Sequence, residues 1–190
     1  MKISIIIPTY NEEKNIILLL QSLINQSYLA DEIIICDGGS KDNTIKLINN
    51  FIKDYTSIKL VPRLGKCRGA GRNTGINFAN NQYLALIDAG TIPVKDWLEN
   101  LVKPIVDNNN NKIVYGVAKP IISSSIEIVI GSIVISKKNY QGIISPTVSS
   151  LLINKEIWKI TGKFPESRNG DYIVEDLIFL EKLKKFEKYS

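Results

Sequence analysis

The residues best suited to chemistry lie in a basic, glycine-rich stretch, RLGKCRGAGRNTG, at positions 63–75. Its glycines precede an acid, Asp88, that stands nineteen positions after Gly69, and this spacing is typical of loops that bind dinucleotides. The stretch contains no acid and carries four cations, Arg63, Lys66, Arg68 and Arg72. The pattern predicts a phosphate-binding loop and leaves open whether the ligand is NAD or another phosphorylated molecule.

Three features of this stretch argue against NAD. A dinucleotide loop directly follows the first strand of its fold, whereas this one follows the third apolar run, with seven residues between Val61 and Gly69. The second apolar run already ends in an acid, Asp37, that suits a nucleoside. Dinucleotide loops also rely on backbone N–H groups, and added cations are better suited to a diphosphate whose charge grows as it leaves.

The general base of any reaction here cannot be histidine, because the chain has none. A carboxylate, a lysine or a tyrosine is left for that role. The two cysteines, Cys36 and Cys67, form no disulfide framework, and without histidine they predict no zinc-type cluster. We expect Cys36 in the core and no chemical role for Cys67.

Strands and helices that alternate along residues 1–115 must position these groups. Continuous β-branched runs predict strands buried on both faces, and apolar residues at helical spacing predict the helices between them. The expected strands are 3–7, 32–36, 58–61 and 83–87, and the expected helices cover 16–24, 45–55 after an N-cap at Ser40, about 70–79, and 97–102 before a bend or end at Pro104. This alternation predicts a single α/β domain with a mostly parallel central sheet flanked by helices.

Ligands of such sheets bind beyond the carboxyl ends of the strands. Four segments follow the predicted strands, namely residues 8–12 (PTYNE), 37–40 (DGGS), the basic loop 63–72, and 88–90 (DAG). Acids and a cationic loop therefore converge on one edge of the predicted sheet.

The remaining chain contains fewer regular patterns. Residues 113–118 and 150–153 predict strands, and a short helix with a turn at Gly162 follows the second. Residues 120–150 show no clean period, so a strand pair, an acceptor-binding flap and a membrane-facing patch all remain open. The last segment predicts a helix that buries Leu177, Leu180 and Leu183, and because it ends while still amphipathic we expect a missing C-terminal element.

The composition, 44% hydrophobic and 23% charged over 190 residues, fits a globular protein of one domain. No apolar run reaches the roughly 18 residues of a membrane span, and the N-terminal run is broken by Pro8 and predicts no signal peptide. We therefore expect a cytoplasmic protein. The net charge of +5 is not accompanied by a nucleic-acid-reading motif, so no nucleic-acid partner is predicted. An acidic ligand, or peripheral contact with an anionic membrane on its cytoplasmic face, explains the excess equally well.

Five segments occur in an order that resembles family 2 glycosyltransferases of the GT-A fold: ISIIIPTYNEEKNI, DEIIICDGGSKDNT, GKCRGAGRNTGINFA, YLALIDAG and VEDLIF. The resemblance runs from residue 3 to about residue 183. It implies a Rossmann-like fold, and inverting transfer of a sugar from a nucleotide-diphosphate sugar, a UDP- or GDP-sugar, to an acceptor hydroxyl. It places the donor on residues 1–115 and a lipid-linked, glycan or protein acceptor on residues 116–190, and it implies Mg²⁺ or Mn²⁺ as cofactor.

The resemblance also assigns roles to single residues. The nucleoside pocket would be lined by Pro8, Thr9, Tyr10 and Glu12, with Asp37 on the base or ribose. The rest of the donor would contact Lys66, Arg72, Asp88 and Ala89, with Asp88 as metal ligand. The general base would be Asp176, with Glu175 beside it orienting the loop or contacting the acceptor. A sugar hydroxyl is a poor nucleophile, so a positioned carboxylate is needed to take its proton.

Two positions depart from the family's pattern. Gly38 replaces the second acid of the segment after the second strand, which leaves base selectivity open. Gly90 replaces the acid that usually helps to bind the metal. Asp88 with diphosphate oxygens and water would still suit Mg²⁺, which prefers hard oxygen ligands. Alternatively, the cations Lys66, Arg68 and Arg72 would neutralise the diphosphate without metal.

Structural interpretations of the same residues remain. Asp37 fits a turn that opens a helix, Asp88 fits a strand-to-loop transition, and Asp176 fits the favourable position of an acid at a helix N-terminus. We expect Trp97 and Trp158 in the core. Two rival functions are a sugar-nucleotide nucleotidyltransferase, whose glycine loop would directly follow the first strand, and a non-catalytic nucleotide-sugar-binding protein, which the missing acid at Gly90 suggests.

Overall fold

The computed structural model describes residues 1–62, 64, 67–108, 110–116, 147–166 and 175–187. Its elements in chain order are β1 (Ile3–Thr9), α1 (Ile16–Ile24), β2 (Glu32–Asp37), α2 (Thr44–Phe51), the 3-10 helix η1 (Ile52–Asp54), β3 (Ile58–Pro62), α3 (Arg68–Phe78), β4 (Tyr83–Ile87), α4 (Trp97–Asp107), β5 (Ile113–Tyr115), β6 (Ser150–Asn154), α6 (Lys155–Thr161) and α7 (Glu175–Glu187).

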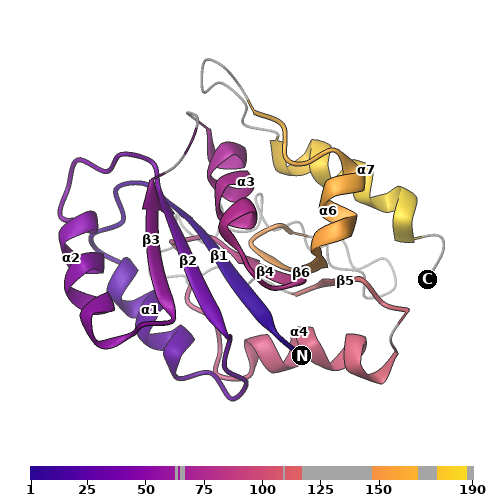
Figure 1. Cartoon of the computed structure of the whole chain (residues 1–190), viewed down its shortest axis with the longest axis horizontal. Coiled ribbons are helices and arrows are strands. Elements are labelled where there is room, and N and C mark those ends of the chain that lie inside the picture. Colours follow the sequence, from indigo (N-terminus) through magenta and orange to yellow (C-terminus); the bar gives the residue numbers. More distant parts are fainter. Residues whose placement is uncertain (63, 65–66, 109, 117–146, 167–174, 188–190) are drawn as a thin grey trace, which may run out of the picture.

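The strands form one sheet of six, in the order β3-β2-β1-β4-β6-β5 (Figure 1). The first four strands run parallel, and the register pairs Thr9 with Asp37 and Ile6 with Leu86. The mostly parallel sheet that the alternation predicts is therefore confirmed, and the carboxyl ends of β1 to β4 share one edge. β6 runs antiparallel to both of its neighbours, β4 and β5, so the later part of the chain returns into the sheet beside β4.

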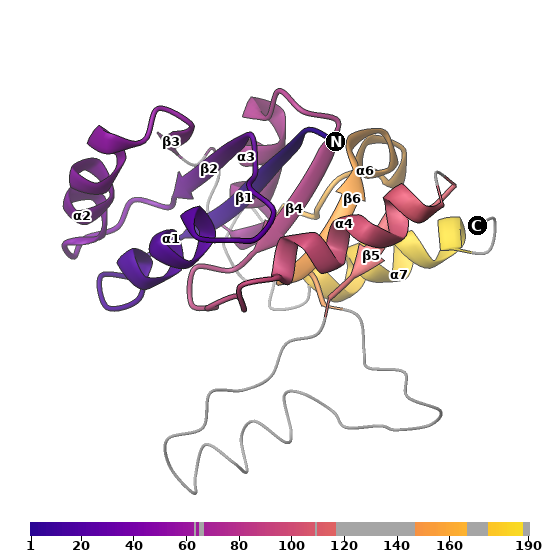
Figure 2. The same cartoon turned by 90° about the horizontal axis from the view of Figure 1, so that it is seen from below.

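Helices cover both faces of this sheet (Figure 2), which explains why its strands are continuously apolar. Ile3, Ile5 and Ile7 of β1 pack with α1, α2 and α4 on one face, and Ile6 packs with α3, α6 and α7 on the other. Successive side chains of a strand point to opposite faces, so one run of isoleucines contributes to two cores. Both tryptophans are buried in these cores, as predicted.

The predicted buried face of the last helix is partly wrong. Leu180 and Leu183 of α7 are buried, but Leu177 is 65% exposed and Phe179 occupies the core in its place. Phe179, Leu180, Leu183 and the partly buried Phe186 recur at helical spacing on one side of α7, and Leu177 lies on the other side. Leucines three residues apart are compatible with burial of either side of α7, so they could not determine which side of the helix faces the core.

Several predicted boundaries also need correction. Ser40 does not cap α2, which begins at Thr44 after Asn43. Pro104 does not end α4, because the helix continues to Asp107 and the N–H of Asn108 donates to the carbonyl of Pro104. The strand predicted over 113–118 ends at Tyr115. Its last two residues, and residues 120–146 of the stretch without a clean period, lie outside the described residues.

The predicted turn at Gly162 is present after α6, with a φ of 90° that favours glycine. Among the helices that the structure describes, none combines the length and the apolar character needed to cross a bilayer.

Candidate active site

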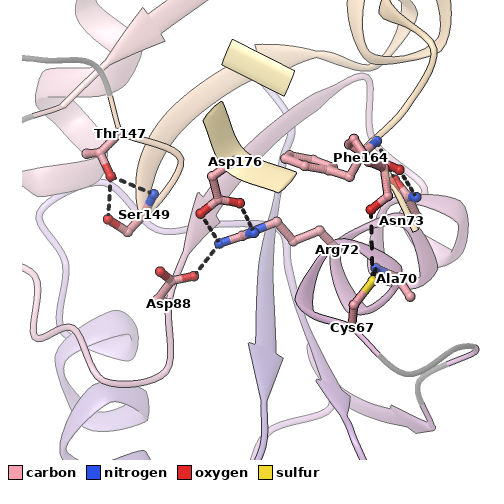
Figure 3. Close-up of polar contacts among 10 residues, drawn as sticks. Cys67, Ala70, Arg72, Asn73, Asp88, Thr147, Ser149, Phe164 and Asp176 are labelled. Carbon is pink, nitrogen blue, oxygen red and sulfur yellow. Dashed lines mark hydrogen bonds and ion pairs between the residues drawn. The ribbon is translucent and has the colours of Figure 1, made fainter. Parts of the chain in front are cut away.

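Arg72 of α3 joins two carboxylates that come from distant parts of the chain. Its Nη2 donates to Asp88 Oδ1 at 2.7 Å, and its Nη1 and Nη2 both donate to the carboxylate of Asp176 (Figure 3). Asp88 follows β4 and Asp176 lies in the first turn of α7. The arginine side chain is 1% exposed, whereas those of Asp88 and Asp176 are 28% and 29% exposed. A ligand can therefore reach the two acids more easily than the cation that holds them.

Two glycines allow α3 to lie close enough for this contact. A Cβ atom at Gly75 would lie 2.6 Å from Ile6 Cγ2 and 2.7 Å from Cys36 Sγ, and one at Gly69 would lie 2.4 Å from the carbonyl oxygen of Pro165. These separations are far below the van der Waals contact distance of about 3.5–4.0 Å. Gly69 and Gly75 are thus packing residues of a helix. This corrects the loop expected over 63–72, since residues 68–72 belong to α3.

Hydrogen bonds of Asn73 connect the segment after α6 to α3. Its Oδ1 accepts hydrogen bonds from Trp158 Nε1 at 3.1 Å and from the N–H of Phe164 at 3.0 Å. Its Nδ2 donates to the carbonyl of Phe164 at 2.9 Å and to Glu166 Oε1 at 2.6 Å. A buried amide with all these bonds holds a single arrangement, because each bond would be costly to lose in the core.

Phe164 connects α3 to α7 by contacts of its ring. Its ring lies 5.4 Å from the guanidinium carbon of Arg72, within reach of a cation–π contact, and stacks on Phe179 with 3.9 Å between ring centroids. The contacts fix the start of α7 relative to α3 and thereby position Asp176. Asn73 and Phe164 are not among the predicted site residues, because no sequence pattern indicates a hydrogen bond between residues 91 positions apart.

Several charges compete around Asp176. Burial raises the pKa of its carboxyl, Arg72 lowers it, and the negative charges of Asp88 and Glu175 raise it again, so that the net pKa is raised. A carboxylate with a raised pKa takes up a proton more readily, which suits a general base. Glu175 beside it is 4% exposed, and its Oε2 has no hydrogen-bond partner among the described residues.

The ends of β1 and β2 form the second part of the site. Thr9 and Asp37 are neighbours in the register, and the N–H of Gly38 donates to the carbonyl of Thr9 at 2.8 Å. Asp37 Oδ2 accepts hydrogen bonds from the N–H groups of Gly39 at 2.7 Å and Ser40 at 2.9 Å. Asp37 therefore does stabilise a turn, as its structural interpretation predicts, and this turn follows directly on the strand end.

The other residues predicted around the nucleoside lie along the same edge. Pro8 is the penultimate residue of β1, and Tyr10 follows that strand with half of its surface exposed, so its ring is open to a ligand. Ala89 is buried beside Asp88. Lys66 lies outside the described residues.

Glu12 lies in the loop after β1, which is hydrogen-bonded to the loop after β2 and to the start of α2. The N–H of Glu12 donates to Thr44 Oγ1 at 2.8 Å, and its carbonyl accepts from Ile16 at the start of α1. Asn11 has a φ of 54° and bonds to the loop after β2 through Ser40. The Glu12 side chain extends toward Gly90, where its Oε1 would lie 3.9 Å from an added Cβ. Glu12 is expected at the nucleoside, and its proximity to Gly90 could not be predicted from the sequence.

The structure thus brings the acids of three strand ends and the start of α7 to one edge of the sheet. Arg72 is expected at the diphosphate, and in the structure its guanidinium bonds to two carboxylates. A positioned carboxylate beside an edge that suits a phosphorylated ligand can take a proton from a nucleophile as a diphosphate leaves.

Comparison with known proteins gives the family of the chain. The family model described as "Glycosyl transferase family 2" matches residues 4–127. Glycosyltransferase AglE of Haloferax volcanii is 34% identical over 106 residues, which cover 54% of this chain and 35% of that protein. The UDP-Glc:alpha-D-GlcNAc-diphosphoundecaprenol beta-1,3-glucosyltransferase WfgD of Escherichia coli is 30% identical over 107 residues, covering 56% of this chain and 42% of that protein. The chain spans less than half the length of either relative.

Solved structures show the same fold. A crystal structure of S. aureus TarS 1-349 superposes with a TM-score of 0.70 at 19% identity, covering 96% of this chain and 55% of that one. A mannosyltransferase from Pyrobaculum calidifontis, in complex with GDP-Man and Mn²⁺, superposes with a TM-score of 0.68 at 21% identity, covering 97% of this chain and 51% of that one. These likenesses establish the GT-A fold that the sequence predicts.

Proposed function

Because the chain belongs to glycosyltransferase family 2, we propose that it transfers a sugar from a nucleotide-diphosphate sugar to an acceptor hydroxyl with inversion, using Asp176 as the general base. The relatives support the donor class, since one is a UDP-Glc-dependent glucosyltransferase and a structural neighbour holds GDP-Man. The acceptor remains a lipid-linked molecule, a glycan or a protein.

The observation that carries this proposal is the shared contact of Asp88 and Asp176 with Arg72. Asp88 lies at the edge where ligands of parallel sheets bind, and Asp176 comes from a helix that packs beside it. The contact keeps a carboxylate base next to the donor edge at a distance set by one guanidinium. Planar, bidentate arginine–carboxylate pairs also have a specific geometry, so the base is held in a defined direction.

The reaction would then proceed as a single displacement. Asp176 takes the proton of the acceptor hydroxyl while the hydroxyl oxygen attacks the anomeric carbon and the bond to the diphosphate oxygen breaks. The electron pair of that bond leaves with the nucleoside diphosphate. Attack on the face opposite the leaving group inverts the anomeric configuration and needs no covalent intermediate. With no histidine in the chain, a carboxylate is a natural base for this step.

Donor binding is assigned to the edge formed by β1, β2 and β4. We propose that Pro8, Thr9, Tyr10 and Asp37 contact the nucleoside, with the exposed Tyr10 ring flanking the base. Lys66 and Ala89 are assigned to the rest of the donor. Arg72 we assign to positioning Asp88 and Asp176, because its N–H groups donate to these acids.

The charges near Asp88 favour a divalent cation at the donor. The carboxylates of Asp88, Asp176 and Glu175 bring negative charge beside the proposed donor edge, and Arg72 and Arg68 oppose it. Asp88 has a hard oxygen to offer, and Mg²⁺ is typically held by one or two carboxylates together with substrate phosphates. No group of three or more acids, cysteines or histidines able to hold a metal occurs within the described part of the chain. A bound cation would offset the charge that grows on the leaving diphosphate.

The direct test is to incubate the protein with UDP- and GDP-sugars and Mn²⁺ and to follow the released sugar by proton NMR. We expect slow release from one nucleotide class even with water as acceptor, and the first sugar formed from an α-linked donor should be the β anomer. Release of the α anomer would contradict inversion. Ligand-induced stabilisation without any turnover would instead identify a non-catalytic binder.

A further inference from the structure

The strand end after β4 has the sequence Asp88-Ala89-Gly90 and so offers one carboxylate where family members usually offer two. Gly90 is not required by the backbone, because the positive-φ glycines of the described residues are Gly39 and Gly162. Nor do packed neighbours exclude a side chain there. A Cβ at Gly90 would meet a single atom within 4 Å, Glu12 Oε1 at 3.9 Å. The space in front of Gly90 is thus adjoined by a carboxylate from another loop.

An aspartate at position 90 would place its own oxygens one carbon beyond that Cβ, in the region that Glu12 Oε1 adjoins. The two carboxylates would therefore serve the same small volume. Asp88 stands two residues earlier on the same strand end, with Oδ1 bonded to Arg72. Its second oxygen makes no hydrogen bond or ion pair to another described residue, and the side chain as a whole is 28% exposed.

Glu12 is held in this position by contacts that do not use Oε1. Its main chain bonds to Thr44, and Oε2 accepts from Asn15 Nδ2 at 3.4 Å. No donor or cation among the described residues pairs with Oε1. Arg72, the cation beside Asp88, is committed to Asp88 and Asp176. Glu12 Oε1 is thus a carboxylate oxygen that pairs with no cation among the described residues and lies beside a position without a side chain, which suits a cation with hard oxygen ligands.

We propose that Glu12 supplies the second protein carboxylate of the divalent-cation site, replacing the acid that position 90 lacks, and shares the cation with Asp88 and the donor diphosphate. This deepens the proposed function and rests on it. The assignment also accounts for the departure at Gly90, because a side chain there would add a further negative charge beside Glu12.

The test measures Mn²⁺ binding rather than turnover. Free Mn²⁺ is titrated by electron paramagnetic resonance in the presence of UDP or GDP, whichever the wild type binds, and binding of the nucleotide alone is measured by calorimetry. Glu12→Gln should weaken Mn²⁺ binding by about 10-fold or more, the scale of losing a ligand or its support. Glu13→Gln is the matched control. It removes the same charge one residue on, and Glu13 accepts hydrogen bonds from Asn43 instead of facing Gly90.

A rescue variant makes the proposal specific to this space. Adding Gly90→Asp to Glu12→Gln should restore Mn²⁺ binding to within about threefold of wild type if the two carboxylates serve one position. Mn²⁺ binding by Glu12→Gln equal to that of Glu13→Gln would overturn the proposal, and so would a double variant no better than Glu12→Gln. Failure of the wild type to bind either nucleotide would contradict the proposed function itself, which separates the two results.

Discussion

Arg72 shows how one side chain can define the relation between two functional groups. Its planar guanidinium donates to the acid at the end of β4 and to the acid at the start of α7. It also opposes the effect of burial on Asp176, whose pKa is raised by desolvation and lowered by Arg72. The position and the protonation of Asp176, the proposed base, therefore depend on the same residue.

Arg72→Gln should change the pH dependence of transfer. Without the positive charge, the pKa of Asp176 rises further above its ordinary value, so the base becomes protonated at higher pH. In a plot of log kcat against pH, the acid limb should shift to higher pH. In addition, kcat should fall roughly 10- to 100-fold because the carboxylate loses its orientation. Initial rates between pH 4 and 8 measure both effects.

Arg68→Gln is the control for this experiment. Arg68 is exposed, and its influence on the pKa of Asp176 is the smallest of those that act on it. The acid limb of the pH profile of Arg68→Gln should shift much less than that of Arg72→Gln. If Arg72→Gln lost activity with an unmoved acid limb, the arginine would be structural and Asp176 would not be the titrating base.

At the level of elements, α3 is the part that brings the site together. It lies on β1 and β2 because Gly75 presents no side chain to Ile6 and Cys36, and it meets the segment before α7 because Gly69 presents none to Pro165. The glycines that suggest a phosphate loop in the sequence are thus explained by close packing. A glycine in a sequence does not say which of these two needs it serves.

Gly75→Ala tests this role of α3. Alanine is normally the better residue in a helix interior, by about 1 kcal/mol. Here the added methyl group would press on the sheet, so we expect a loss of about 1–3 kcal/mol in the free energy of unfolding, measured by urea denaturation. Asn77→Ala in the same helix is exposed and should be neutral or slightly stabilising. Equal stability of both variants would mean that α3 can shift without cost.

The same elements show what the sequence could predict. The strands were accessible because burial on both faces demands continuous runs such as ISIII, and parallel order then placed Asp37 and Asp88 on one edge. The rotation of α7 was not accessible, because Leu177 fits a helical stripe as well as Phe179 does. The bond between Arg72 and Asp176 was not accessible either, since it joins residues 104 positions apart and depends on how α7 packs.

On the scale of the whole molecule, residues from the two parts of the chain meet at one guanidinium. The strands β1 to β4 supply the edge proposed for the donor, and β6 returns antiparallel beside β4 before the chain reaches α6 and α7. The division into a donor-binding part, residues 1–115, and an acceptor-binding part, residues 116–190, remains a prediction. The fold is consistent with it, because Asp176 reaches the donor edge from the second part.

The central claim is that Asp176 acts as the base in a displacement at the donor edge, and Asp176→Asn tests it most directly. The measurement is the single-turnover rate of sugar transfer or donor hydrolysis, alongside nucleotide diphosphate affinity, with exposed Asp107→Asn as control. The account predicts a rate that is lower than that of the wild type by about 100-fold or more, with nearly unchanged nucleotide affinity, because the amide keeps the shape and loses the basicity. A rate within about twofold of wild type would remove Asp176 from the mechanism and contradict the account.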